Sequence, residues 1–278
     1  MPEDLPRVRG ALSAFHAVRR EAVAAVPGDP TGTVVRHWEG TDVVATASPG
    51  SALGWVQRVV GVGPDDHGVV DEVAAWFVDL HVPVWEAEVI PAGGDVRPLS
   101  AALARHGLLP SRHLDVLAGP VPPPPVSAPG GVVVTDVESG DGDRFAGVLL
   151  DGFGDSRGPG GAEHSAIARW PSLPSMRCCV AELAGETVGA AALMLDRGVA
   201  LLANAAVLPA ARQQGVHGAL LAHRIDAARR AGVDFLAAAA QRGGPSHRNQ
   251  RRAGLAVAAT LAIWTSAPAG LPPPPNIG

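Results

Sequence analysis

A run of prolines divides the chain near its middle. Residues 120–125 read Pro-Val-Pro-Pro-Pro-Pro, and Gly130 and Gly131 follow shortly after. Such a run adopts the extended polyproline II conformation and cannot join a helix or a central strand. We therefore expect a semi-rigid linker at residues 120–131, between domains at residues 1–119 and 132–267, and a proline-rich tail at residues 268–278.

Composition and charge exclude several classes of protein. The chain has 278 residues, of which 47% are apolar and 18% charged, which is typical of globular domains with sizeable cores. Its net charge is −5 and no long run of arginine occurs, so we expect no nucleic-acid partner. Cys178 and Cys179 are adjacent, a spacing that suits neither an ordinary disulfide nor a metal site. The N-terminus has no apolar signal core, and the longest uncharged apolar run, residues 255–264, is too short to span a bilayer, so we expect a cytoplasmic protein without membrane contact.

The pattern after the linker predicts an α+β domain. Helical and strand periods alternate in the order strand, helix, helix, three strands, helix, strand, helix, strand. The three middle strands are joined by turns of two to four residues and should form an antiparallel meander. The predicted elements are strand 132–134, helix 141–153, helix 163–170, strands 176–183, 188–195 and 199–207, helix 214–231, strand 233–239, helix 246–253 and strand 255–264.

The segment that follows the third strand of the meander predicts an anion site. The strand ends near Val207, a loop with Arg212 and Gly215 follows, and a long helix begins. Free N–H groups and the positive end of the helix dipole attract anions, and glycine lets a backbone approach a pyrophosphate closely. An ordinary strand–loop–helix connection, in which the glycines serve only the turn, is the alternative.

Two motifs give this region a family resemblance. Arg212-x-x-Gly215-x-His217 resembles the acetyl-CoA pyrophosphate loop of the GCN5-related N-acetyltransferases (GNAT), although the small residue of that loop comes one place later, at Gly218. Residues 244–255 resemble the helix after the fifth strand of the same family, in a form common in high-GC bacteria. Together the two motifs and the element order extend the resemblance over about residues 131–264.

The resemblance implies a fold, an activity and a co-substrate. The fold would be a GNAT-like mixed, mostly antiparallel sheet flanked by helices, and the activity transfer of acetyl from acetyl-CoA, or of another short acyl group, to a primary amine of a small molecule or peptide. A non-catalytic acyl-CoA-binding module on the same fold is the alternative. The residues that the resemblance assigns to acyl-CoA are Ala205, Ala206, Val207, Arg212, Gln213, Gln214, Gly215, Val216, His217, Gly218, Asn249 and Arg252.

The catalytic groups are less defined than the acyl-CoA site. Many relatives use a tyrosine as the acid, but this chain has no tyrosine, and Gln250 stands in that place. Ser246 is the candidate for hydrogen bonding to the leaving sulfur, and Asn204, Glu182 and His164 are candidates near the acceptor. Glu182 could equally be a solvated carboxylate, and His164 a surface residue.

The N-terminal half holds a weaker echo of the same order. Helix 69–80, strand 82–90, helix 98–105 and strand 112–118 predict a tandem arrangement of two such domains. The anion loop is missing from the first of them, because Asp65 and Asp66 begin its helix and would repel a pyrophosphate. We interpret this half as a degenerate copy, with an unrelated α+β domain as the alternative, in a monomer or a homodimer.

Overall fold

The chain forms two compact units. The computed structural model describes residues 2–51, 56–91, 94–123, 131–154 and 161–266. Unit 1 comprises the described residues within 1–116, 239–242 and 257–278, and unit 2 those within 117–238 and 243–256. Most of the predicted linker, residues 124–130, and the predicted tail lie outside the described residues.

Unit 1 is built on a sheet that contains the strand order β1-β2-β3-β4-β11. The β3–β4 pair is parallel, and the other three pairs are antiparallel. The elements of unit 1 are η1 Pro2–Asp4, α1 Leu5–Ala24, β1 Val34–His37, β2 Val44–Ala47, β3 Arg58–Val62, η3 Pro64–Gly68, α2 Val70–Asp79, β4 Glu86–Val89, α3 Arg97–Arg105, most of β5 Leu108–Pro120 and nearly all of β11 Ala256–Ser266.

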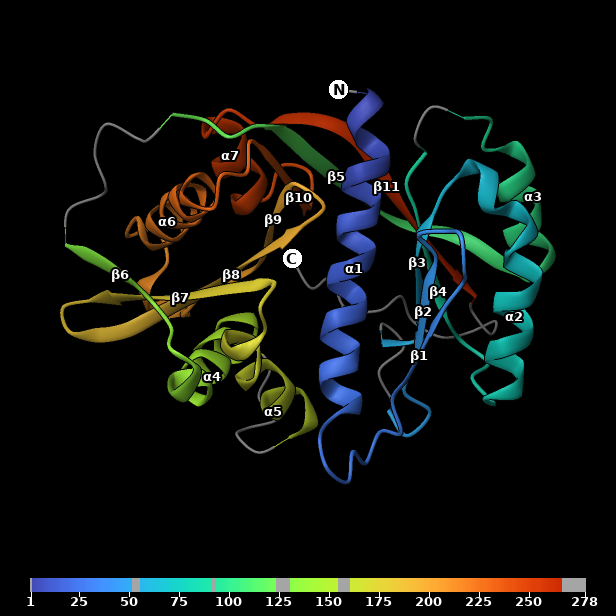
Figure 1. Cartoon of the computed structure of the whole chain (residues 1–278), viewed down its shortest axis with the longest axis horizontal. Helices are drawn as coiled ribbons and strands as arrows, with labels where there is room; N and C mark the ends of the chain where they lie inside the picture. Colours follow the sequence, from blue (N-terminus) through green and yellow to red (C-terminus); the bar gives the residue numbers. More distant parts are fainter. Residues whose placement is uncertain (1, 52–55, 92–93, 124–130, 155–160, 267–278) are drawn as a thin grey trace. The chain divides into compact units, whose positions relative to one another are not determined.

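Helices cover both faces of the unit 1 sheet. Side chains alternate between the faces of a strand, so neighbouring residues of β2 belong to different layers. Ala45 packs with α2 and α3, around Phe77 and Leu103, in the larger apolar cluster. Val44 faces α1 and contacts Ala17. Figure 1 shows α1 on one side of these strands, and α2 and α3 on the other.

Unit 2 contains the strand order β10-β9-β8-β7-β6. The pairs from β6 to β9 are antiparallel, and β9 and β10 are parallel. The order of helices and strands along unit 2 is the one that the sequence predicts. The elements of unit 2 are β6 Val132–Asp136, η4 Ser139–Asp141, α4 Gly142–Phe153, α5 Ala162–Ala168, η5 Trp170–Ser172, β7 Met176–Leu183, β8 Glu186–Asp196, β9 Val199–Val207, η6 Pro209–Ala211, α6 Val216–Arg230, most of β10 Phe235–Ala240 and α7 Pro245–Arg252.

The unit 2 sheet also lies between helices. On one face, Val216 and Leu220 of α6 pack against Ala191 and Val207. On the other face, α4 approaches β9 so closely that a Cβ added to Gly152 would lie 2.7 Å from the Ala206 Cβ. Figure 1 shows α4 and α6 on opposite sides of β7 and β8. The end of β9 is therefore held from both faces of the sheet.

The last strand differs from the sequence interpretation, which grouped it with the second domain. All of β11 except its first residue belongs to unit 1. Its antiparallel register with β4 runs from the Ala262–Val89 pair to the Thr265–Glu86 pair. The hydrogen-bonding partner of a strand is a long-range property, which neither the periodicity nor the linker of this chain indicates.

Candidate functional site

Strand β9 loses its parallel neighbour partway along its length. The β9–β10 ladder joins only three residue pairs, from Val199–Phe235 to Leu201–Ala237. On its other side, β9 stays paired with β8 up to Val207. The second half of β9 therefore has a strand partner on one side only, within the described residues.

Backbone donors point to this unpaired edge. The Leu208 N–H donates to the Val188 carbonyl oxygen at 2.8 Å. Gly189 and Val207 are therefore a non-hydrogen-bonded pair of the antiparallel ladder. The N–H of Val207 consequently points away from β8. The same alternation turns the N–H of Ala205, two residues earlier, in the same direction. Two of the predicted acyl-CoA contacts thus present donors on the edge that no strand covers.

A β-bulge lies just before these donors. Ala191 pairs with Ala205, whereas Leu193 pairs with Leu202, so β9 has one residue more than β8 across this interval. Bulges bend a strand and redirect its groups, and they are over-represented beside active sites. The half-buried Asn204 belongs to this bulge, and within the described residues its side chain makes no hydrogen bond.

The loop after β9 leads into a helix start that no side chain caps. Gln213 and Gly215 have left-handed backbones, with φ of 65° and 82°. Gly215 is the N-cap of α6 and supplies no side-chain hydrogen bond. Because the first intrahelical bond of α6 runs from the Ala219 N–H to the Gly215 carbonyl, the N–H groups of Val216 to Gly218 have no acceptor within the helix. This geometry suits an anion.

Arg212 makes different contacts from those expected of it. Its Nη2 donates to the Gly152 carbonyl at 3.0 Å, and its Nε to the Val207 carbonyl at 3.3 Å. The guanidinium therefore ties the end of α4 to the end of β9, and its contact with a phosphate stays a prediction. Carbonyl groups at a helix C-terminus are unsatisfied acceptors, which explains why a cation binds there.

The predicted residues of α6 and α7 contact each other. The Asn249 side-chain amide donates to His217 Nδ1 at 3.0 Å, and its oxygen accepts from Arg252 Nη1 at 3.1 Å. Burial, with a smaller contribution from the charge of Arg224, lowers the pKa of His217 to about 4. His217 is therefore neutral near pH 7, and it fixes α7 beside the first turn of α6.

Gln250 orients the hydroxyl of Ser246. The Gln250 Nε2 donates to Ser246 Oγ at 3.0 Å, so the hydroxyl hydrogen remains available to another acceptor. Gln250 is 3% exposed, and its buried Oε1 has no hydrogen-bond partner among the described residues. The residue in the tyrosine position is thus a buried support for Ser246.

Glu182 and His164 have partners elsewhere in unit 2. Glu182 lies on β7, which β8 separates from β9, and forms an ion pair with Arg144 of α4. His164 is buried, unlike a surface histidine, and its Nδ1 lies 3.7 Å from Asp143 Oδ1. Within the described residues, no hydrogen bond or ion pair joins either side chain to the edge of β9.

The corresponding parallel pair of unit 1 has no such opening. Strands β3 and β4 pair from Arg58–Glu86 to Val62–Val89, across one irregularity. At the start of η3, Asp66 Oδ2 accepts the Gly63 N–H at 2.7 Å. A carboxylate of the chain itself therefore lies in the loop between β3 and α2, where it accepts the N–H of the residue just before η3.

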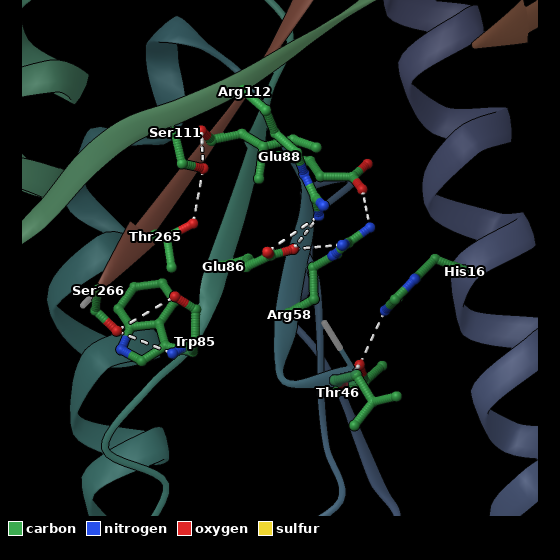
Figure 2. Close-up of polar contacts among 12 residues, drawn as sticks. His16, Thr46, Arg58, Trp85, Glu86, Glu88, Ser111, Arg112, Thr265 and Ser266 are labelled. Atoms are coloured by element: carbon green, nitrogen blue, oxygen red, sulfur yellow. Dashed lines mark hydrogen bonds and ion pairs between the residues drawn. The ribbon is translucent and has the colours of Figure 1, made fainter. Parts of the chain in front are cut away.

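Unit 1 instead contains a buried ion cluster (Figure 2). Glu86, which is 1% exposed, accepts from Arg58 and from Arg112, the latter at 2.8 and 3.0 Å. Arg58 also pairs with Glu88. Removing one member would leave a buried charge without its partner, so this cluster links β3 and β4 to β5, which lies beyond β11 in the sheet.

His16 of α1 is another buried polar residue of unit 1. Its Nε2 lies 2.9 Å from Thr46 Oγ1, whose own hydrogen goes to the Val56 carbonyl at 3.0 Å, so Nε2–H is the donor. Burial and, to a lesser degree, the nearby arginines lower the pKa of His16 well below its ordinary value.

Within the described residues, no group of three or more His, Cys, Asp and Glu side chains could hold a metal ion. None of the described helices is long and apolar enough to cross a bilayer.

Comparison with known proteins agrees with this geometry. The model of the acetyltransferase (GNAT) family matches residues 151–254, which include β9, the loop after it, α6 and α7. No curated protein sequence matches the chain. The resemblance drawn from the sequence is thus confirmed over residues 151–254.

Solved structures share the fold over nearly the whole chain. A GCN5-related N-acetyltransferase from Kribbella flavida aligns with a TM-score of 0.64 at 18% identity, over 93% of this chain and 96% of that one. One from Sphaerobacter thermophilus gives 0.56 at 21%, over 95% and 93%. A tandem GNAT protein from the clavulanic acid biosynthesis pathway gives 0.61 at 15%, over 96% and 95%. The fold class expected from the sequence, a mixed and mostly antiparallel GNAT-like sheet flanked by helices, is therefore confirmed, while a degenerate N-terminal copy remains a prediction.

Proposed function

We propose that unit 2 binds an acyl-CoA, with acetyl-CoA as the expected form, and transfers its acyl group to a primary amine of a small molecule or peptide. The observation that carries this proposal is the unpaired edge of β9 next to the uncapped start of α6. A pyrophosphate and an extended amide-containing arm need these two features side by side: free helical N–H groups for the first and strand-like backbone donors for the second.

Each part of the acyl-CoA has a matching backbone group. The N–H groups of Val216 to Gly218 receive the pyrophosphate. The donor of Ala205 pairs with the pantetheine arm as a neighbouring strand would. The Val207 N–H polarises the thioester carbonyl and stabilises the oxyanion that forms on it. Arg212 supports this arrangement by holding the Val207 carbonyl.

The transfer step needs little further chemistry from the chain. The neutral amine attacks the thioester carbon, a C–N bond forms, the C–S bond breaks, and the proton lost by the amine balances the charge of the thiolate. The hydroxyl of Ser246, oriented by Gln250, stabilises the departing sulfur by donating a hydrogen bond. Asn204, whose side chain makes no hydrogen bond within the described residues, orients the acceptor amine at the bulge.

Unit 1 fits the interpretation of a copy without an acyl-CoA site. Its parallel strands remain paired to the Val62–Val89 pair, and the Asp66 carboxylate lies in the loop between β3 and α2, where it accepts the Gly63 N–H. A carboxylate at that position repels a pyrophosphate. We propose that unit 1 binds no acyl-CoA.

A binding module without transferase activity is the second candidate. It is favoured by the absence of tyrosine from the chain and by the ion pair that occupies Glu182. Thiol release from acetyl-CoA in the presence of a panel of primary amines separates the two. Release that depends on the amine, with an acetylated product detected by mass, supports the transferase. Tight binding without release for any amine would leave only the module.

A further inference from the structure

Arg224 is a buried cation in the middle of α6. The residue is 2% exposed and lies one turn from Leu220, on the face of the helix that packs on the sheet. Its side chain forms no ion pair with a carboxylate of the chain within the described residues. A buried charge without a counter-charge destabilises the folded state, so the presence of Arg224 at this position indicates a specific role in the structure.

The Arg224 guanidinium binds backbone carbonyls at the β9 bulge. Its Nη1 donates to the Ala192 oxygen on β8 at 3.1 Å and to the Ala203 oxygen on β9 at 3.0 Å. Its Nε donates to the Leu220 oxygen of its own helix at 3.2 Å. Burial lowers the pKa of Arg224 to about 10, so the group remains a cation near neutral pH.

These contacts occur where the β8–β9 ladder is interrupted. The register changes between the Leu193–Leu202 and Ala191–Ala205 pairs, and Ala192 lies opposite the extra residue of β9. Bulge groups have lost their regular ladder partners and need others. One guanidinium nitrogen bridging both strands supplies such a partner and fixes how the strand leaves the bulge toward Ala205 and Val207.

We propose that Arg224 is a positioning residue for the acyl-CoA site, which holds the bulge so that the donors of Ala205 and Val207 face the unpaired edge of β9. This inference rests on the proposed function of unit 2. A cation on the Ala203 carbonyl also polarises the peptide group that this carbonyl shares with the Asn204 N–H. Arg224 thereby acts on the acyl and pantetheine end of the ligand, whereas the first turn of α6 receives the phosphates.

Because Arg224 acts on the acyl and pantetheine end and the first turn of α6 on the phosphates, a change at Arg224 should weaken binding of one probe and not of the other. Calorimetry compares two probes, acetyl-CoA and 3′-phosphoadenosine 5′-diphosphate, a fragment of CoA that ends at the pyrophosphate. Arg224→Met removes the donors while keeping an apolar stem, and we expect acetyl-CoA to bind about tenfold more weakly, because two backbone contacts lose their alignment. The fragment should bind within about twofold of the original protein, because the helix start is intact.

Two further variants complete the test. Arg230→Met changes an exposed arginine of the same helix, which pairs with Asp226, and should leave both affinities unchanged. Arg224→Lys keeps one cationic donor group and should restore part of the acetyl-CoA affinity with the same selectivity; it also serves as the test if the Met variant does not fold. Equal loss for both probes, or no loss for either, would overturn the positioning role alone. A wild-type protein that binds neither probe would overturn the proposed function as well.

Discussion

Gly152 provides a stability test of the close packing between α4 and β9. In the interior of a helix, alanine is more stable than glycine by about 0.5–1 kcal/mol, so Gly→Ala normally stabilises. At Gly152 the added Cβ would lie 2.7 Å from the Ala206 Cβ and 3.1 Å from the Val207 nitrogen. Overpacking of this kind costs about 1–3 kcal/mol, so the net expectation for Gly152→Ala is a loss of about 1–2 kcal/mol in the free energy of unfolding.

The same helix contains a matched control. Apart from its chain neighbours and the backbone of its own helix, no atom of the described residues lies within 4 Å of a Cβ added to Gly147, so Gly147→Ala should stabilise by about 0.5–1 kcal/mol. Urea unfolding of the two variants under identical conditions measures the difference, which should be about 2 kcal/mol. If Gly152→Ala proves as stable as Gly147→Ala, α4 does not press on β9 as described, and the account of how Val207 is held fails.

Two further predictions concern buried charge. Glu86→Gln leaves Arg58 and Arg112 without their shared carboxylate and should lower the free energy of unfolding by about 3 kcal/mol. Glu21→Gln, at an exposed ion pair, should change it by less than about 1 kcal/mol. Similar urea midpoints for the two variants would contradict the importance of the cluster. The pKa of His217 is lowered to about 4 in the folded state, so between about pH 6.5 and 4 the unfolded state binds the proton first, and this residue destabilises the protein progressively as the pH falls. His217→Gln should flatten that part of the pH profile of stability relative to wild type, and parallel profiles would show that the imidazole is not buried as described.

Much of unit 2 could be predicted from the sequence because its signals are local. Apolar residues recur at regular spacing in the meander strands and in α6, and Gly215 indicates the turn into the helix. The side-chain contacts were not predictable in this way. Arg212 looks like a phosphate ligand in the motif, yet the acceptors it finds are carbonyls of α4 and β9, which lie close to it only in the folded chain.

Arg224 did leave a signal in the sequence. It lies four residues after Leu220 and four before Ala228, within the apolar stripe of α6, and a charged residue at such a position is rarely buried without a purpose. The bulge that it serves has no comparable signature, because Ala203 and Asn204 do not break the strand pattern. Its role therefore emerges only from the register of β8 and β9.

The early part of unit 1 was harder to predict. Helix α1 buries Ser13, His16 and Arg20 along with its apolar residues, which weakens the apolar stripe that identifies a helix. Strands β1 and β2 have four residues each, close to the lower limit for recognition from alternation. The later elements α2, β4, α3 and β5 were predicted at close to their observed positions, because their apolar spacing is regular.

The loop after β9 is where we propose that an acyl-CoA binds. Calorimetric titration with acetyl-CoA tests this proposal with two matched variants at opposite ends of α6, Gly215→Glu and Gly232→Glu. Both glycines are exposed and left-handed, with φ of 82° and 71°, so both substitutions impose similar strain and add one negative charge. We expect saturable binding by wild type, retained in Gly232→Glu and abolished in Gly215→Glu, where the carboxylate meets the phosphate position. Equal binding by the two variants, or none by wild type, would contradict the account.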